Sequence, residues 1–495
     1  MPRPKSFLKE SKKKKTAQRT PRSADEFLAA GVELEEAGEK WRAGDATKSM
    51  RFFMRAIALY DEGLQAFPTA FDLAYNKARV QYETTQHPKL VTQLSAPLAD
   101  VLRITLQSHR DALALDQDNA DVLFNTAQVL TSLAEATTDT KHPADDQLAQ
   151  AIQFLQEAIE LFQRCLLLQE LRYTESQEQI RLMEAEMSGQ LQEQEHKQEQ
   201  EIEHENEQEQ EQEQWAAIVE PVTKNTLVDT AVAQLETLTT LCNLLVFTPG
   251  VGLAWVEEYS TDLYRAKIAA YAQGSDRNYE AAVAHAKFTC ALSEVLYRSG
   301  RIEIDTYHRE IGRAFGAELD LSADPDALCS KGEALASFNT AVADLPPAHD
   351  ADALSNSLAL RWQALSLALD ALTAATKLPD VENLPKIHIG RGDAELGRWR
   401  LGAEPWNYSM AKENAAVLLK NAQTYYRGAA ALARRDGAVE EEKEGTCKEA
   451  IAAALGQDTA KLEQLKMGAP QELSAVAEDM IDDGLVPPII MQELS

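Results

Sequence analysis

The sequence has few cysteines and few aromatic residues, and it has no long hydrophobic run. Five cysteines are spread through 495 residues, and no Cys-x-x-Cys pair occurs, which argues against a disulfide framework and against the usual zinc-site spacing. We therefore expect reduced thiols in the core of a cytosolic or nuclear protein. No segment approaches the ~20 consecutive apolar residues that span a bilayer, and the first residues lack the apolar stretch of a signal peptide. We expect no membrane partner.

Strand-like runs are absent as well, because valine and isoleucine do not cluster along the chain. Alanine, leucine, glutamate and glutamine are abundant, and these residues favour helix. Hydrophobic residues make up 44% of the chain and aromatic residues only 6%, so a core has to be built mainly from aliphatic side chains. A chain of this length allows roughly three domains or one extended array. The composition predicts an all-α fold.

Positive charge is scarce outside the first residues. The net charge is -30. Residues 1–22 contain nine Lys or Arg and one Glu, so the residues after them carry -38. A body with that charge repels phosphates, which argues against nucleic acid as its partner. A basic protein is the partner that the charge favours.

Catalytic and metal-binding motifs are also missing. The nine histidines include no pair with the spacing of a zinc hydrolase, and no GxSxG, phosphate-loop or GxGxxG sequence occurs. Residues 390–397, GRGDAELG, predict the start of a helix with Asp393 near its N-cap rather than a nucleotide site. Residues 116–121, DQDNAD, lack the glycine and the glutamate of a calcium loop and predict a turn. We therefore expect no enzyme, no metal and no cofactor.

The sequence does contain internal repeats. FDLAYNKARV at 71–80 is followed 49 residues later by ADVLFNTAQV at 120–129, with Asp, an aromatic residue, Asn, Ala and Val at the same places. A second pair is SMRFFMRAIALYDEGL at 49–64 and AIQFLQEAIELFQRCL at 151–166. Repeats of this kind indicate helical hairpins, which bury their apolar faces only by stacking on one another.

The order of helix, Gly-Asp turn, helix, proline and helix resembles that of tetratricopeptide repeats. Small residues at fixed places let the two helices of a hairpin approach each other, and large residues fill the gaps. The residues predicted to pack within the repeats are Ala56, Tyr60, Pro68, Asn76, Ala112, Asn125, Ala127, Ala158 and Phe162. The second helices are longer than a standard repeat allows. We therefore predict a right-handed solenoid of degenerate tetratricopeptide-type helical hairpins.

Asn76 and Asn125 stand where some repeats of this type clamp a C-terminal carboxylate. The basic residues that complete such a clamp are missing, and Asp121 stands where a lysine is needed. Acidic residues repel a carboxylate. We interpret both asparagines as residues that form hydrogen bonds between helices.

The helical pattern continues beyond Trp215, with turn signals between the helices. The helices predicted there are 222–246, 252–273, 277–299, 304–318, 326–343, 351–376, 384–402, 407–435, 439–455 and 471–484. We expect five segments: a basic disordered head (1–22), N-terminal helical repeats (23–188), a Glu/Gln-rich insertion (189–214), C-terminal helical repeats (215–486) and a tail (487–495).

Two segments have a strongly biased composition. Residues 190–214 hold ten Glu, nine Gln and one Lys; without an apolar face they predict a solvated helix or disordered spacer. The alternative is an acidic arm that holds a basic partner. The head carries Lys12, Lys13, Lys14 and Lys15, which predict a nuclear localisation signal. The alternatives are an RNA- or ribosome-binding arm and a tail without function.

The basic head, the degenerate helical repeats, the acidic body and the stretch AVAEDMIDDGLV at 475–486 together resemble the fungal enhancer-of-translation-termination family. The resemblance covers the layout of most of the chain. Its clearest match is the cluster Lys12–Lys15, whereas the Glu/Gln run departs from it.

This resemblance implies a nuclear protein-binding adaptor, able to shuttle to the cytoplasm, that regulates gene expression and translation termination without catalysis. The alternative is a dedicated chaperone for a basic client, either a histone or a ribosomal protein, since such chaperones also interrupt their repeats with acidic insertions. The sequence leaves the identity of the partner and the oligomeric state open.

Overall fold

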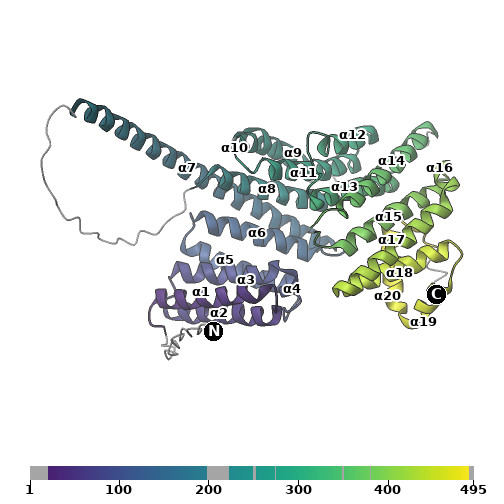
Figure 1. The fold of residues 1–495 in the computed structure, drawn as a ribbon, viewed down its shortest axis with the longest axis horizontal. Helices are drawn as coiled ribbons and strands as arrows, with labels where there is room; N and C mark the ends of the chain where they lie inside the picture. The colour runs from purple at the N-terminus through teal and green to yellow at the C-terminus, as the bar shows by residue number, and fades with distance from the viewer. Residues whose placement is uncertain are drawn as a thin grey trace, which may run out of the picture. The chain divides into compact units, whose positions relative to one another are not determined.

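The computed structural model describes residues 21–197, 222–248, 252–273, 275–347, 351–379 and 381–489, and for residues 186–197 it describes the backbone alone. In this part of the chain every regular element is a helix and no strand occurs (Figure 1). The predicted all-α fold is therefore confirmed. The chain divides into two compact units, and the boundary between them along the sequence lies between Cys165 and Leu166.

The first unit is a stack of helices joined by short turns. Its helices are α1 (Ala24–Arg42), α2 (Ala46–Ala66), α3 (Phe71–Gln86), α4 (Pro88–Val91), α5 (Leu98–Leu115), α6 (Ala120–Thr137) and the first part of α7 (Asp145–Lys197). α1 packs on α2, α2 on α3, α3 on α5 and α5 on α6. α1 also contacts α3, and α3 contacts α6, so each hairpin lies on the next as the repeats predict.

The hairpin between α1 and α2 follows directly from its sequence. Asp45 accepts a hydrogen bond from the Lys48 amide at 2.9 Å and so caps α2. Tyr60 lies against Gly31, where a Cβ atom would come within 2.2 Å of the tyrosine ring. Glycine is needed at this position because any larger residue would push α1 and α2 apart.

The two copies of the repeated decapeptide lie in α3 and α6. Ala78 and Val80 of α3 are at most 1% exposed, and so are Ala127 and Val129 at the equivalent places of α6. Pro68 lies in the turn between α2 and α3. The residues predicted to pack within the repeats that are at most 1% exposed are Ala56, Tyr60, Ala112, Ala127, Ala158 and Phe162.

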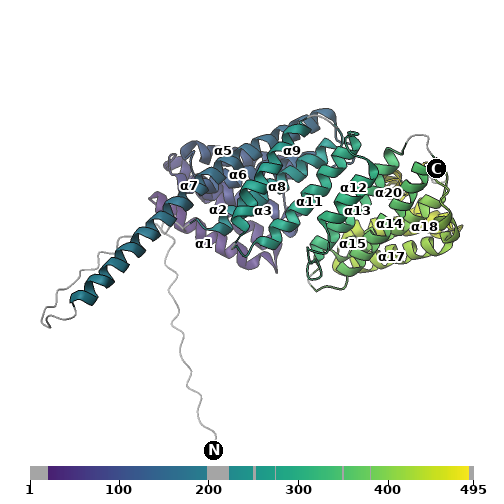
Figure 2. The same ribbon diagram turned by 90° about the horizontal axis from the view of Figure 1, so that it is seen from above.

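The second unit is also built from helices that pack on one another (Figure 2). Its helices after α7 are α8 (Lys224–Leu245), α9 (Leu253–Asp262), the π-helix η1 (Leu263–Ile268), α10 (Ala269–Ala272), α11 (Asn278–Arg298), α12 (Ile304–Ala314), α13 (Pro325–Asp344), α14 (Ala351–Ala375), α15 (Leu384–Gly402), α16 (Ser409–Glu413), α17 (Ala415–Asp436), α18 (Val439–Leu455), α19 (Ala460–Gly468) and α20 (Pro470–Asp482). α11 packs on α8 and α13, and α13, α14, α15, α17 and α18 each pack on the next.

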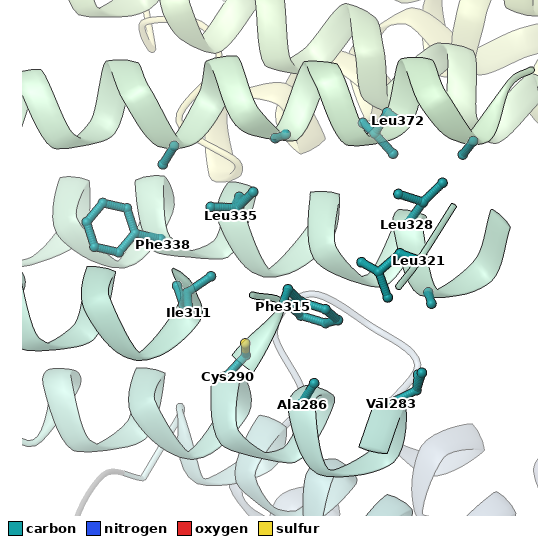
Figure 3. Packing of buried hydrophobic residues seen from close by; sticks show 14 of the residues in the cluster. Val283, Ala286, Cys290, Ile311, Phe315, Leu321, Leu328, Leu335, Phe338 and Leu372 are labelled. Atoms are coloured by element: carbon teal, nitrogen blue, oxygen red, sulfur yellow. The ribbon is translucent and has the colours of Figure 1, made fainter. Parts of the chain in front are cut away.

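The core of the second unit is aliphatic with a few aromatic rings, as the composition predicts. Figure 3 shows Leu335 and Phe338 of α13 between Ile311 of α12 and Leu372 of α14. Phe338 is fully buried. Apolar side chains from α11 to α14 thus form one continuous cluster, which holds these helices together mainly by the hydrophobic effect.

Asp393 lies in the middle of α15, so its prediction as a residue near an N-cap is wrong. The cap is Asn383, which accepts a hydrogen bond from the Lys386 amide at 3.1 Å. Asp393 accepts hydrogen bonds from the Tyr426 hydroxyl at 2.8 Å and from Lys448 Nζ at 3.0 Å. Its half-buried carboxylate therefore joins α15 to α17 and α18, and the neighbouring glycines belong to the helix instead of preceding it.

The other helices predicted beyond Trp215 have their outer boundaries within two residues of the prediction, except that the predicted helix 304–318 ends at Ala314. Two of them are interrupted. The predicted helix 252–273 contains the π-helical turn η1 between α9 and α10, and the predicted helix 407–435 breaks at Asn414 into α16 and α17. The short helices α4 and α19 are not predicted, because four and nine residues are too few to establish a helical period. Of the predicted turn at 116–121, residues 116–119 form the turn before α6, and residues 120 and 121 are the first two of the helix.

Candidate protein-binding surface

Ion pairs join α1 to α3 in the first unit. Arg42 pairs with Glu83, and Arg79 pairs with Glu35. The hydroxyl of Tyr60 in α2 donates a hydrogen bond to the same Glu35. Glu35 is only 5% exposed, so it connects three helices, and its charge is compensated by one arginine and one hydroxyl.

Hydrogen bonds join α3 to α6 next to these ion pairs. Asn125 donates from Nδ2 to the Tyr75 hydroxyl at 3.1 Å, which is a bond between helices as predicted. Asn76 instead bonds within its own helix: Nδ2 donates to the Asp72 carbonyl at 2.8 Å and Oδ1 accepts from Arg79 at 3.2 Å. The prediction of an interhelical bond for Asn76 is therefore wrong, because Arg79 on the same face of α3 lies within its reach.

A hollow of about 280 Å³ opens where α3 and α6 end and α5 begins. The residues that line it are Thr85, Gln86, Leu98, Leu102, Ser132, Glu135, Ala136 and Asp139. Helix C-termini carry partial negative charge, and α3 and α6 end at Gln86 and Thr137. The hollow therefore combines two leucines, two carboxylates and two negative helix ends with one positive helix end, the start of α5.

Such a lining suits a long cationic side chain. Lys and Arg side chains bury their aliphatic stems against apolar groups while the charged end stays near polar ones. Leu98 and Leu102 offer the apolar contact, and Glu135 and Asp139 offer the negative charge. The hollow can thus receive a lysine or arginine from another protein.

Exposed apolar side chains follow the part of α7 that belongs to the second unit. Leu167, Leu171, Ile180, Leu182 and Met183 are between 45% and 65% exposed. None of the residues 171–185 is buried, and both views show the end of this helix extending past the helices beside it (Figures 1 and 2). A long solvent-facing helix with several large apolar residues is a second surface that can contact a protein.

The cysteines are free thiols, and four of them are buried. Burial raises the pKa of the Cys242 and Cys290 thiols to about 12, which keeps them protonated and unreactive. Within the described ranges, no group of three His, Cys, Asp or Glu side chains is placed to hold a metal ion. Among the helices that the structure describes, none is both long and apolar enough to cross a membrane.

Two predicted features fall outside the residues that the structure describes. The proposed nuclear localisation signal, Lys12, Lys13, Lys14 and Lys15, lies in residues 1–20. Most of the Glu/Gln run lies in residues 198–221. Both remain predictions from sequence.

Comparison with known proteins finds two fungal relatives of part of the chain, and no family model matches. The UPF0656 protein C926.02 of Schizosaccharomyces pombe is 32% identical over 159 residues, which are 32% of this chain and 35% of that protein. The uncharacterized protein YNL193W of Saccharomyces cerevisiae is 29% identical over 83 residues, 16% of this chain and 15% of that protein. The chain thus spans about a third of the length of the first relative and less of the second.

One solved structure aligns over nearly the whole chain. It is a circular tandem repeat protein with novel repeat topology and enhanced subunit contact surfaces, 12% identical, covering 93% of this chain and 99% of its own. The TM-score is 0.28, so this likeness carries no argument about function.

The carboxylates of the hollow were not identified from the sequence. Glu135 and Asp139 are four residues apart at the end of α6, so they share one helix face. That spacing alone is common on exposed helices. The pair is a candidate site because the tertiary structure places it beside the end of α3 and the start of α5.

Proposed function

We propose that the protein is a non-enzymatic adaptor that binds a basic segment of another protein through its helical hairpins. The hollow lined by Leu98, Leu102, Glu135 and Asp139 is the observation that carries this proposal. It would receive one lysine or arginine of the partner, while the net charge of -30 would attract the partner over a longer range.

The finer part of the proposal rests on the sequence alone. The repeats would be degenerate tetratricopeptide-type hairpins, and Lys12–Lys15 would direct the protein to the nucleus. In line with the resemblance to the fungal enhancer-of-translation-termination family, the adaptor would regulate gene expression and translation termination there.

Co-purification distinguishes this adaptor from the alternative of a dedicated chaperone. We expect release factors, transcription factors or an oxygenase to co-purify with the full chain. A single histone or ribosomal protein at equal stoichiometry would instead establish the chaperone.

Substitution in the hollow tests how the co-purified partner binds. We expect the double variant Glu135→Gln and Asp139→Asn to weaken binding at least tenfold, since one well-formed charge-assisted contact contributes about 1.5–3 kcal/mol. The matched control is Glu36→Gln with Glu39→Gln, which removes the same charge from exposed positions of α1. Equal binding by the two double variants would contradict a specific role of the hollow.

A salt series tests the long-range part of the proposal. Because the Debye length is about 8 Å at physiological ionic strength, we expect the association rate to fall steeply between low and physiological salt. The dissociation rate should change much less. Surface plasmon resonance with the purified partner measures both rates, and an association rate that does not respond to salt would mean that the acidic charge does not attract the partner.

A further inference from the structure

The basic head contains one short stretch that is not uniformly polar. Phe7 and Leu8 are the only aromatic or large aliphatic side chains between residues 2 and 22. Lys5 and Lys9 stand on either side of them. The segment 5–9 therefore combines an apolar pair with two cations, whereas the residues after it in the head are polar and mostly basic.

The hollow in the first unit has the complementary chemistry. Leu98 and Leu102 supply apolar contact, and Glu135 and Asp139 supply negative charge. Both acidic residues are exposed, so a segment of chain can reach them from solvent. Lysine stems add apolar contact of their own while the ammonium groups approach the carboxylates. An apolar pair between two lysines thus finds two leucines and two carboxylates in one place.

The hollow and the start of α1 lie at opposite edges of the first unit. Glu35 of α1 pairs with Arg79 of α3, and further along both helices Arg42 pairs with Glu83. α1 and α3 therefore run in the same direction and end at the same edge. The hollow lies at the end of α3. A part of the head that fills the hollow has to return from Ala24 along the whole length of α1.

This distance selects the residues of the head that can reach the hollow. α1 is about 27 Å long between Ala24 and Arg42, and two helix spacings, from α1 across α3 to α5 and α6, add about 20 Å sideways, so the straight path is about 35–40 Å. Extended chain covers at most about 3.3–3.6 Å per residue. Lys12, twelve residues before Ala24, reaches the hollow only at full stretch. Lys9 and Lys5, fifteen and nineteen residues before Ala24, reach it with length to spare.

We propose that the segment 5–9 occupies the hollow of its own chain and competes there with the basic partner. The inference rests on the proposed function, because it assigns a second, intramolecular ligand to the same hollow. A short flexible connection, which the sequence predicts here, gives an effective concentration in about the millimolar range. A segment with a Kd of about 0.1 mM would then fill the hollow in about nine of ten molecules and weaken the apparent affinity for the partner about tenfold.

Competition between the head and a free peptide tests this occupant in the full chain. The probe is a synthetic peptide with the sequence of residues 1–11, labelled with fluorescein at its C-terminus, and fluorescence anisotropy measures its Kd. We expect Lys5→Ala with Lys9→Ala to bind the probe at least tenfold more tightly than the unchanged protein, because the hollow of this variant is open. The matched control is Lys12→Ala with Lys13→Ala, which removes the same charge from residues too close to α1 and should leave the Kd unchanged.

The possible results separate this inference from the proposed function. Equal tightening in the two double variants would mean that only the charge of the head matters, and equal Kd values for the unchanged protein and the Lys5→Ala, Lys9→Ala variant would mean that the head does not compete. Either result overturns the inference and leaves the hollow as a binding site. If the Lys5→Ala, Lys9→Ala variant does not bind the probe, or binds it equally well after Glu135→Gln and Asp139→Asn are added, the proposed function fails too.

Carbodiimide cross-linking locates the segment directly, because this reagent joins a lysine amine to a carboxylate when the two lie in contact. In the unchanged protein we expect links from Lys5 or Lys9 to Glu135 or Asp139, identified by mass spectrometry. A mixture of unlabelled and nitrogen-15-labelled protein shows whether both ends of a link belong to one chain. Links that form mainly between chains, or that join the segment 5–9 only to other carboxylates, would overturn the inference.

Discussion

His109 of α5 is a buried histidine whose neutral form is favoured in the folded protein. It is fully buried, and its Nδ1 lies 3.0 Å from the Thr105 carbonyl oxygen, so Nδ1 carries the proton. Its Nε2 has no hydrogen-bond partner. Burial lowers the pKa of His109 from 6.5 to about 4. The unfolded chain therefore binds the proton at a higher pH than the folded chain.

This difference predicts a loss of stability as the pH falls from about 6.5 toward 4, with the full contribution present at neutral pH. We expect His109→Phe to remove about 2 kcal/mol of the pH dependence between pH 7 and pH 5, since one pKa unit corresponds to 1.36 kcal/mol. Urea unfolding of both proteins at the two pH values measures it. An equal change in both proteins would show that His109 does not titrate on unfolding.

Gly31 is the second residue whose role can be tested by itself. Its Cβ would lie 2.2 Å from the ring of Tyr60, so Gly31→Ala should force α1 and α2 apart. We expect the free energy of unfolding to fall by about 1–3 kcal/mol, as for other overpacked cores, in urea unfolding. Gly312→Ala is the control: it is also helical, with no atom within 4 Å of its added Cβ, and it should leave stability equal or raised. A harmless Gly31→Ala would contradict the close packing.

Single residues also show what a sequence can and cannot reveal. The buried positions of the repeat, such as Ala78 and Ala127, were predicted because a helical period depends on near neighbours in the chain. The partners of Asp393, which are Tyr426 and Lys448, were not predicted, because they lie on other helices and are brought to it by the tertiary structure. The hollow could not be found from sequence for the same reason. The partners of Asn76 lie in its own helix and were missed because an interhelical bond was expected.

At the scale of helices, α7 was predicted as a helix from its sequence, but its length was not. The sequence predicts a helix at 151–166 and places the end of the first repeat region at residue 188. The structure has one helix of 53 residues, Asp145–Lys197, whose second half buries no side chain between residues 171 and 185. Helix propensity alone can extend a helix that tertiary contacts have nucleated, and no local stop signal marks where those contacts end.

Removing the Glu/Gln run tests whether it supports the fold. Because the preceding residues 171–185 are not buried, we expect replacement of 190–214 by a short Gly/Ser linker to leave the thermal midpoint almost unchanged. Shortening such a connection changes the loop entropy by only about 0.6 kcal/mol per doubling of length. Calorimetry checks this, and a midpoint lower by about ten degrees or more, equivalent to several kcal/mol, would show that the run packs on the helices.

At the scale of the whole molecule, charge is distributed very unevenly. Nine basic residues stand in residues 1–22, while the rest of the chain carries -38. This distribution is fully visible in the sequence. It leads to two separate expectations: a basic partner for the body, and a nuclear localisation signal in the head. The position of the Glu135 and Asp139 carboxylates beside α3 and α5 is visible only in the structure.

The head can be tested in cells with a fluorescent fusion. We expect the change of Lys12, Lys13, Lys14 and Lys15 to alanine to move the protein from the nucleus to the cytoplasm, because a localisation signal depends on clustered positive charge. Helicity by circular dichroism should not change. Changing Lys5 and Lys9 to alanine, in the same head, is the control. Unaltered nuclear accumulation of the four-lysine variant would mean that the protein enters with a partner.

Two buried tyrosines, Tyr60 and Tyr426, provide an absorbance signal for unfolding. Tyr60 donates to Glu35 and Tyr426 donates to Asp393, and burial together with these carboxylates raises the pKa of both phenols well above the ordinary value. In an alkaline titration, exposed phenols lose their protons and absorb as phenolates near the usual pKa of about 10. Tyr60 and Tyr426 cannot lose their protons until the helices around them separate. A late, abrupt rise in phenolate absorbance at alkaline pH would therefore report the unfolding of the first unit, which contains Tyr60, or of the second, which contains Tyr426. This measurement needs no added fluorophore.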